Sequence, residues 1–379
     1  MPARRRALLK TVAISMGGAA FPMLNFGRFQ VFAQIPTRYS VRAVDLIKRS
    51  LVIDLKHALS LNPETLKSWL TNPGNFGAPQ WQRFQSSGLT VIQTTLETVA
   101  DTLLDYAWHN GFVAGHGDWF TRIDSGQALA SAKASGKLGL IFGSENSAHF
   151  KTADDVNLYF GLGQRVSQLT YNERNLIGSG ATERADDGLS DFGISIVERM
   201  NQVGMAIDVS HCGERTTLDA LEMSKKPVLV THGNPRALNP HHPRTKTDEA
   251  IRKLAAGGGV MGIAYLRIFI RDREPTTIEH ALDHFDYVAR LVGVEHLAVG
   301  SDIDLDGYDD LPREMVAASK ANLKSSYGFR DRDDIEGLDH PQRMYDLVEG
   351  LIRRRYSDAD IELIIGGNAQ RVLSGIWPA

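Results

Sequence analysis

The sequence predicts a single-domain α/β protein built as a (β/α)8 barrel, and three observations support this fold. Eight short apolar runs, rich in β-branched residues, follow one another along residues 34–379, and stretches with helical spacing separate most of them. Strands that alternate with helices pair in parallel through right-handed crossovers. Eight such units in about 320 residues match the size of a closed barrel. A doubly wound open sheet is the main alternative, but it would usually carry a glycine-rich phosphate loop after its first strand, and Leu55-Lys56-His57 is not one.

The expected elements can be placed by residue number. Strands are predicted at residues 51–55, 88–96, 138–144, 166–171, 204–210, 228–232, 258–264 and 297–302. Helical spacing is clearest at residues 97–111, 191–203 and 277–292. No linker or repeat divides the chain, and residues 341–373 predict two helices that cap or flank the barrel.

Residues 1–33 are typical of an export signal and are set apart from the fold. Arg4-Arg5-Arg6 precedes a moderately apolar run at residues 8–24, and Val31-Phe32-Ala33 provides a small-residue cleavage site. This arrangement resembles a twin-arginine (Tat) signal, so we expect a periplasmic or extracellular protein. The run is short for a membrane span, and glycines and a proline interrupt it. An uncleaved membrane anchor is the alternative, and no stable span is expected in the mature chain from residue 34.

The composition excludes several classes of protein. Of 379 residues, 42% are hydrophobic and 23% are charged, which is typical of a soluble globular protein. The net charge of −3 gives no indication of a nucleic acid or an anionic membrane as partner. Cys212 is the single cysteine, so no intrachain disulfide can form and the core must stabilise the fold. Strand alternation predicts that Cys212 is a buried thiol pointing away from the neighbouring His211.

Ionisable residues follow the expected strands at their carboxyl ends, where barrels hold their chemistry. His211 and His232 end two successive strands, and neutral imidazoles are common zinc ligands. Carboxylates follow other strands, among them Glu145 and Asp302, and one carboxylate with the two imidazoles would make a three-ligand zinc site. The fourth position would stay open for a water, whose pKa zinc lowers to about 7. Asp302 follows the last strand and could take a proton from that water and pass it to a leaving amine. The alternative is that both histidines are hydrogen-bonding groups of the core.

Several segments resemble the membrane (renal) dipeptidase family of zinc peptidases. They lie at residues 163–170, 188–193, 200–211, 227–232, 242–244, 299–302 and 367–371. The resemblance runs from about residue 50 to the C-terminus. It implies a (β/α)8 barrel with two zinc ions that hydrolyses dipeptides and related small amides, in some members with a D-residue at the C-terminal position. It also makes a homodimer plausible.

The resemblance assigns roles to individual residues. Glu145 matches the carboxylate that bridges the two metals, and His211 and His232 match the other ligands of the second metal. Asp302 matches the acidic residue that holds the substrate amine or moves protons. Arg244 matches the arginine that holds the substrate's free carboxylate, a task that suits a planar guanidinium with two parallel hydrogen bonds.

Strand 1 departs from the family pattern. Lys56 stands where the family has a histidine ligand, and Ala58 stands where it has an aspartate ligand. A protonated lysine has no lone pair for zinc, and alternation turns His57 to the other face of the strand. We therefore predict one zinc ion rather than two, with the Lys56 ammonium near the place of the first. The alternative is a decayed site in which Lys56 forms a buried pair with Asp54 or Glu145.

Strand 4 departs as well, because Tyr171 stands where the family has a substrate-contacting histidine. A tyrosine keeps a hydrogen-bond donor for an oxyanion but loses the imidazole's charge. The predicted function is metal-dependent hydrolysis of dipeptides or related small amides. The predicted residues are Asp302, Tyr171 and Lys56 for catalysis, Arg244, Tyr171 and Asp302 for substrate binding, and Glu145, His211 and His232 for the metal. The alternatives are another small amide, ester or lactone as substrate, or an inactive homologue that binds small peptides.

Overall fold

The computed structural model describes residues 28–30, 38–96, 100–321, 323–328 and 330–378. Most of the predicted Tat signal, residues 1–27 and 31–33, lies outside the described residues. Strand β1 (Arg28–Gln30) pairs in antiparallel fashion with β2 (Arg38–Ser40) across the predicted cleavage position. None of the helices in the described part of the chain is long and apolar enough to span a membrane.

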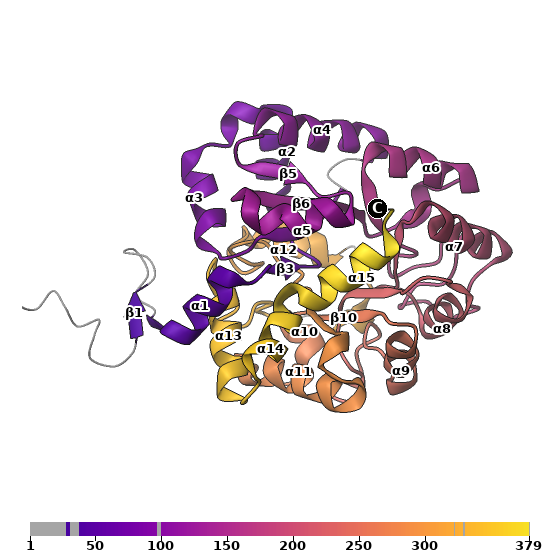
Figure 1. Ribbon diagram of the computed structural model, residues 1–379. Coiled ribbons are helices and arrows are strands. Elements are labelled where there is room, and N and C mark those ends of the chain that lie inside the picture. Colours follow the sequence, from indigo (N-terminus) through magenta and orange to yellow (C-terminus); the bar gives the residue numbers. More distant parts are fainter. Residues whose placement is uncertain (1–27, 31–37, 97–99, 322, 329, 379) are drawn as a thin grey trace, which may run out of the picture.

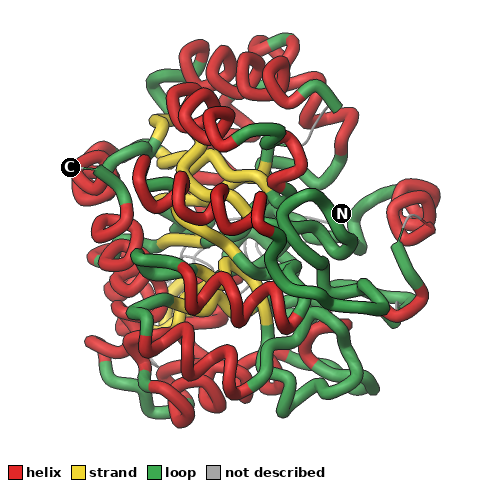
Figure 2. Tube along the Cα trace, turned by 90° about the vertical axis from the view of Figure 1, so that its right-hand side faces the viewer, coloured by secondary structure: helices red, strands yellow, loops and turns green. Residues whose placement is uncertain are grey.

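Parallel strands occupy the centre of the molecule and helices surround them (Figures 1 and 2). The backbone N–H of Leu55 donates to the Val299 carbonyl, and that of Asp302 donates to the Lys56 carbonyl, both at 2.8 Å. The first and last barrel strands therefore meet, which confirms the predicted (β/α)8 barrel. In hydrogen-bonded order the strands are β3 (Ile53–Asp54), β4 (Val91–Thr95), β6 (Leu138–Ser144), β7 (Gln164–Gln168), β8 (Ala206–Asp208), β9 (Leu229–Gly233), β10 (Val260–Ile263) and β11 (Leu297–Val299).

All eight predicted strands are present, and three short strands were not predicted: β1, β2 and β5 (Phe120–Arg122). Strand β5 pairs in parallel with the start of β6. Three residues are too few for the alternation of apolar and polar side chains to identify a strand.

Helices and single turns connect the strands. The α-helices are α1 (Val41–Arg49), α2 (Pro63–Thr71), α3 (Ala78–Ser86), α4 (Thr102–Gly115), α5 (Gly126–Ser135), α6 (Ala153–Leu162), α7 (Asp191–Val203), α8 (Glu214–Met223), α9 (Asp248–Ala256), α10 (Arg267–Ile270), α11 (Ile278–Val292), α12 (Arg313–Ala321), α13 (Arg343–Arg353), α14 (Asp358–Glu362) and α15 (Asn368–Ile376). The short turns are η2 (Pro73–Asn75), η3 (Ser147–His149), η4 (Val294–His296), η5 (Ser325–Tyr327) and the π-helical η6 (Leu363–Gly367).

Local sequence signals set the bounds of two predicted helices. Helix α7 has the predicted bounds because Ser190 accepts a hydrogen bond from the Gly193 N–H at its start and Gly204, with φ +82°, ends it. Helix α11 begins one residue later than predicted, since Thr277 is its N-cap. The predicted helix at residues 97–111 corresponds to α4, while residues 97–99 lie outside the described part of the chain.

The C-terminal segment closes the amino end of the barrel. Instead of two helices, it forms α13 and then a run in which η6 joins α14 to α15. The run turns at Gly366, where a Cβ would lie 1.8 Å from the Leu51 carbonyl oxygen, so only glycine allows this approach. Ala369 and Leu373 of α15 pack with Val91 and Leu229 of the barrel interior. This confirms the predicted capping role and leaves the opposite, carboxyl end open for a site.

Candidate active site

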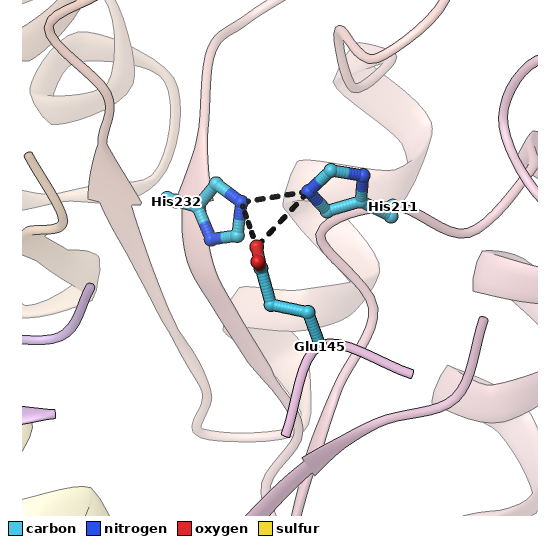
Figure 3. Close-up of side chains that lie close together, drawn as sticks. All are labelled: Glu145, His211 and His232. Carbon is cyan, nitrogen blue, oxygen red and sulfur yellow. Dashed lines mark hydrogen bonds and ion pairs between the residues drawn. The ribbon is translucent and has the colours of Figure 1, made fainter. Parts of the chain in front are cut away.

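Three predicted metal ligands converge at the carboxyl end of the barrel (Figure 3). Glu145 follows β6, His211 follows β8 and His232 lies in β9. The two Nε2 atoms of the histidines are 3.0 Å apart, and Glu145 Oε1 lies 3.3 Å from that of His211 and 3.4 Å from that of His232. The ends of β6, β8 and β9 therefore each place one donor atom near a common point.

The other ring nitrogen of each histidine has a partner that fixes its proton. His211 Nδ1 donates to the Asn172 side-chain oxygen at 2.8 Å. His232 Nδ1 donates to Thr231 Oγ1 at 2.9 Å, because the Thr231 hydroxyl itself donates to Asp208 Oδ2 at 2.6 Å. Both tautomers, assigned from this network, leave a lone pair on Nε2.

The electrostatics of this point favour a cation. Burial lowers the pKa of His211 and of His232 well below the usual value, and Arg244 lowers both further. The lone pairs of two neutral imidazoles and a carboxylate oxygen thus face one another. These three acceptor atoms repel one another unless a positive ion binds between them. The residues present fit one metal ion with three protein ligands.

Lys56 follows β3 and occupies the other side of Glu145. Its Nζ lies 3.3 Å from Glu145 Oε2, 3.9 Å from Asp302 Oδ1 and 2.9 Å from Thr95 Oγ1. The Lys56 side chain is 9% exposed. The predicted pair of Lys56 with Glu145 is present. Asp54 contacts Lys56 differently, by accepting its backbone N–H.

The two residues after Lys56, His57 and Ala58, do not join the predicted metal ligands. His57 is fully buried, its ring packs 6.3 Å from that of Phe84, and neither ring nitrogen has a hydrogen-bond partner among the described residues. Its backbone pairs with Ile303, so no bulge turns its side chain toward the cavity. Ala58 offers no ligand atom. Of the described residues, neither His57 nor Ala58 therefore places a ligand atom beside Glu145, His211 and His232.

Asp302 sits at the end of β11 in a left-handed backbone conformation, with φ +64°. This conformation is uncommon for a non-glycine residue and turns its carboxyl group toward Lys56. Burial raises the pKa of Asp302 to about 7, against the opposing effect of the Lys56 ammonium. A carboxyl group that titrates near neutrality can both accept and release a proton.

Tyr171 and Arg244 complete the predicted residues. The Tyr171 ring stacks on His211 with centroids 4.3 Å apart, and Tyr171 also lines the cavity. Arg244 is 2% exposed, and its guanidinium donates to the Ser210 carbonyl at 3.0 Å, the His232 carbonyl at 3.3 Å and the Tyr327 hydroxyl at 3.1 Å. The structure thus brings every predicted site residue to one place.

These side chains line a cavity of about 490 Å³, a volume that suits a small molecule. Lys56, Glu145, Tyr171, His211, Arg244 and Asp302 form its polar wall. Residues of α10 and α12 and of the loops beside them form a largely apolar wall. His232 lies beneath Glu145 and His211, fully buried.

Residues 72–323, more than half of the chain, match the model of the membrane dipeptidase family, peptidase family M19. The chain belongs to the membrane dipeptidase family. The matched residues include six of the seven predicted site residues and exclude Lys56, which precedes them.

Relatives in the family include fungal dipeptidases. An uncharacterized dipeptidase of Schizosaccharomyces pombe is 31% identical over 239 residues, and dipeptidase verJ of Clonostachys rogersoniana is 32% identical over 246 residues. These alignments cover 61% and 64% of this chain and 55% and 56% of those proteins, so the chain spans about half the length of the curated relatives it matches. The crystal structure of an amidohydrolase from Pseudomonas aeruginosa superposes with a TM-score of 0.75 at 28% identity, covering 88% of this chain and 99% of that one.

Four residues that support this membrane dipeptidase site were not predicted. Asn172, at φ +58°, holds His211, while Asp208 and Thr231 hold His232. Tyr327 donates to Asn172 at 2.7 Å and accepts from Arg244. Asp208 could have been found from sequence, because an aspartate at the end of a strand often accepts the backbone N–H of the residue two positions later. Asp208 accepts from Ser210 in this way, and Asp54 accepts from Lys56. Tyr327 is the last residue of the single turn η5, which is too short to leave a periodic pattern in the sequence.

Proposed function

We propose that this chain hydrolyses the amide bond of dipeptides or related small amides with one bound metal ion. The observation that carries the proposal is the convergence of Glu145, His211 and His232 at the wall of a cavity that is also lined by Arg244. Membership of the membrane dipeptidase family and the names of the fungal relatives support the same reaction class.

The metal would be held by Glu145 Oε1 and the Nε2 atoms of His211 and His232. Zinc suits two imidazoles and a carboxylate, and when bound it acts as a Lewis acid and makes water acidic enough to attack at neutral pH. We propose one ion rather than two because the Lys56 ammonium lies 3.3 Å from the second oxygen of Glu145, where it neutralises the charge that another cation would neutralise.

The remaining residues of the site would bind and orient the substrate. Arg244 provides a buried guanidinium for the free carboxylate of the substrate. The Tyr171 hydroxyl can donate to the carbonyl oxygen as negative charge develops on it. Asp302, with its pKa near 7, can hold the proton of the attacking water and deliver it to the leaving nitrogen.

The test is hydrolysis of a small library by the chain from Gln34 onward. The library contains L-L and L-D dipeptides, N-acyl amino acids, and simple esters and lactones, each assayed with added zinc and with a chelator. Zinc-dependent release of the amino acid supports the proposal. Turnover of only esters or lactones would replace the substrate class. Binding without turnover under any metal would favour the inactive peptide-binding homologue.

We also propose that residues 1–33 export the folded protein through the Tat pathway. Arg4-Arg5 and the small-residue end at Ala33 support this. A reporter fused after residue 33 should reach the periplasm of a Tat-competent bacterium, and changing Arg4 and Arg5 to lysine should retain it in the cytoplasm. Export of the double variant at the same level would contradict the proposal. The homodimer stays a prediction that analytical ultracentrifugation can test.

A further inference from the structure

The charged side chains around the cavity are unevenly paired. Three carboxylates of the described residues line it: Glu145, Asp302 and Asp333. Lys56 Nζ lies within 3.3 Å of Glu145 and 3.9 Å of Asp302, and Lys320 Nζ lies 2.6 Å from Asp333. Each carboxylate that faces the cavity therefore already has an ammonium group of the protein beside it.

Arg244 differs from the two lysines. Its guanidinium donates only to uncharged oxygens, those of Ser210, His232 and Tyr327, and no ion pair joins it to a carboxylate within the described structure. A buried cation without an anionic partner is costly, and a bound carboxylate would remove that cost. Glu145 and Asp302 thus share the single ammonium of Lys56, and Arg244 is the cation of the cavity wall that has no carboxylate within ion-pair distance among the described side chains.

The position of the Lys56 ammonium between Glu145 and Asp302 discriminates against a charged amine in the substrate. The α-ammonium of a dipeptide lies one carbon from the carbonyl that is attacked, so it would enter the region of Glu145 and Asp302. Lys56 already occupies that region, and like charges about 4 Å apart repel strongly in a buried site. A metal ion on Glu145, His211 and His232 would add further positive charge.

We propose that the preferred substrate is an amide with a free carboxylate on the amine side of the scissile bond and no charged amine on its acyl side, as in an N-acyl amino acid. This inference rests on the proposed amide hydrolysis and names the substrate class of that site. Water adds across the acyl C–N bond: the C–N bond breaks, a C–O bond forms, and the products are a carboxylic acid and an amino acid. Lys56 is then the residue that determines specificity.

The opposite wall of the cavity indicates the character of the acyl group. Its side chains are mostly apolar, and they include Leu61, Leu266, Ile268, Phe269, Leu311 and Met315. Burying an alkyl or aryl group against them is favourable, whereas a polar chain would lose its hydration there. An aliphatic acyl group of several carbons therefore fits this wall better than a charged one.

The experiment compares two substrates that differ only in the amine. Leucyl-alanine has the α-ammonium, and 4-methylpentanoyl-alanine has the same carbon skeleton without it; both alanine enantiomers are used, with added zinc. We expect kcat/KM for the deamino substrate to exceed that for the dipeptide by about tenfold or more. Equal or faster hydrolysis of leucyl-alanine overturns the inference and leaves the proposed function intact. Hydrolysis of neither substrate, nor of any other amide in the library, overturns the proposed function.

Variants of Lys56 test its part in this preference. Lys56→Gln should reduce the ratio of the two kcat/KM values at least about tenfold, while Lys56→Arg, which keeps the charge, should preserve the preference. Circular dichroism and bound zinc establish that each variant is folded. If Lys56→Gln folds poorly, the same comparison can be made on the unmodified protein with two inhibitors. Leucinamide and 4-methylpentanamide are primary amides of the two acyl groups and differ only in the α-amine, and their inhibition constants are compared. An unchanged ratio in a folded Lys56→Gln variant, or equal inhibition by both amides, overturns the role of Lys56.

Discussion

His232 shows how much a single side chain depends on its neighbours for a fixed chemical state. Its Nδ1 proton is held by Thr231, whose hydroxyl is held by Asp208, so Nε2 is left as an acceptor. Its pKa is lowered by burial first and by Arg244 next, so it stays neutral at physiological pH. Lys56 has the opposite surroundings, since its Nζ lies 3.3 Å from the Glu145 carboxylate and 3.9 Å from the Asp302 carboxylate.

The first prediction concerns His232→Ala. This variant should lose the bound metal, measured by elemental analysis of the purified protein, and should reduce turnover at least about a hundredfold, because one of three ligands is removed. The matched control is His57→Asn, which changes another buried histidine at a strand end that contacts no metal ligand. It should keep one metal per chain. Full activity of His232→Ala would remove the proposed mechanism.

The second prediction concerns Arg244→Lys. A lysine keeps the positive charge but cannot offer two parallel donors to a carboxylate, so KM should rise about tenfold or more with a smaller change in kcat. A substrate in which the carboxylate is replaced by a carboxamide should be slow with the unmodified protein and change little in the variant. Equal losses for both substrates would show that Arg244 serves the architecture instead.

At the scale of elements, two aspartates at strand ends perform the same structural task at different seams of the barrel. Asp208, the last residue of β8, accepts from the Thr231 N–H and hydroxyl of β9. Asp54, the last residue of β3, accepts from the Ser301 N–H at 2.9 Å and hydroxyl at 2.5 Å beyond β11. Both carboxylates are buried, and each ties the ends of two adjacent strands together, but only Asp208 leads to a metal ligand.

The third prediction uses this pair. Asp208→Asn should weaken zinc binding about 10- to 100-fold in competition with a chelator, because the Thr231 hydroxyl then no longer orients His232 firmly. Asp54→Asn is the matched change at the β3–β11 seam. It should lower the free energy of unfolding while zinc affinity stays within about threefold of the original. Similar losses of affinity in both variants would contradict a specific role of Asp208.

The whole molecule is a closed barrel with α15 across its amino end and the site at its carboxyl end. This closure buries several histidines as neutral groups, and His284 of α11 is one that lies outside the site. Its Nε2 donates to the Ile270 carbonyl at 2.8 Å, and burial lowers its pKa to about 4. Because the unfolded chain binds this proton at higher pH than the folded chain does, stability falls as pH falls from about 6.5 toward 4.

The fourth prediction follows from His284. Between pH 7 and pH 5 the unmodified protein should lose about 2 kcal/mol more unfolding free energy than His284→Gln, in which no group titrates at that position. Urea unfolding of chelator-treated protein at the two pH values measures the difference, and the chelator removes any contribution from metal loss. The same pH dependence in both proteins would show that His284 also titrates normally when folded.

The sequence by itself determined the barrel, its eight strands and the residues at their carboxyl ends. Periodicity is a local property, and parallel strands place their ends together whatever the loops do. His211, His232 and Asp302 were therefore predictable from position, whereas the family resemblance selected Glu145 among the carboxylates there and added Arg244 and Tyr171. The replacement of a ligand by Lys56 was visible only through that resemblance.

Only the tertiary structure decided what these residues touch. Which oxygen of Glu145 faces the histidines and which faces Lys56, and that Tyr327 and Asn172 link Arg244 to His211, depend on contacts between segments far apart in the chain. The short strand β5 and the turn at Gly366 also depend on such packing. Long-range contacts of this kind leave no periodic pattern in the sequence, because each depends on the shape of the whole barrel.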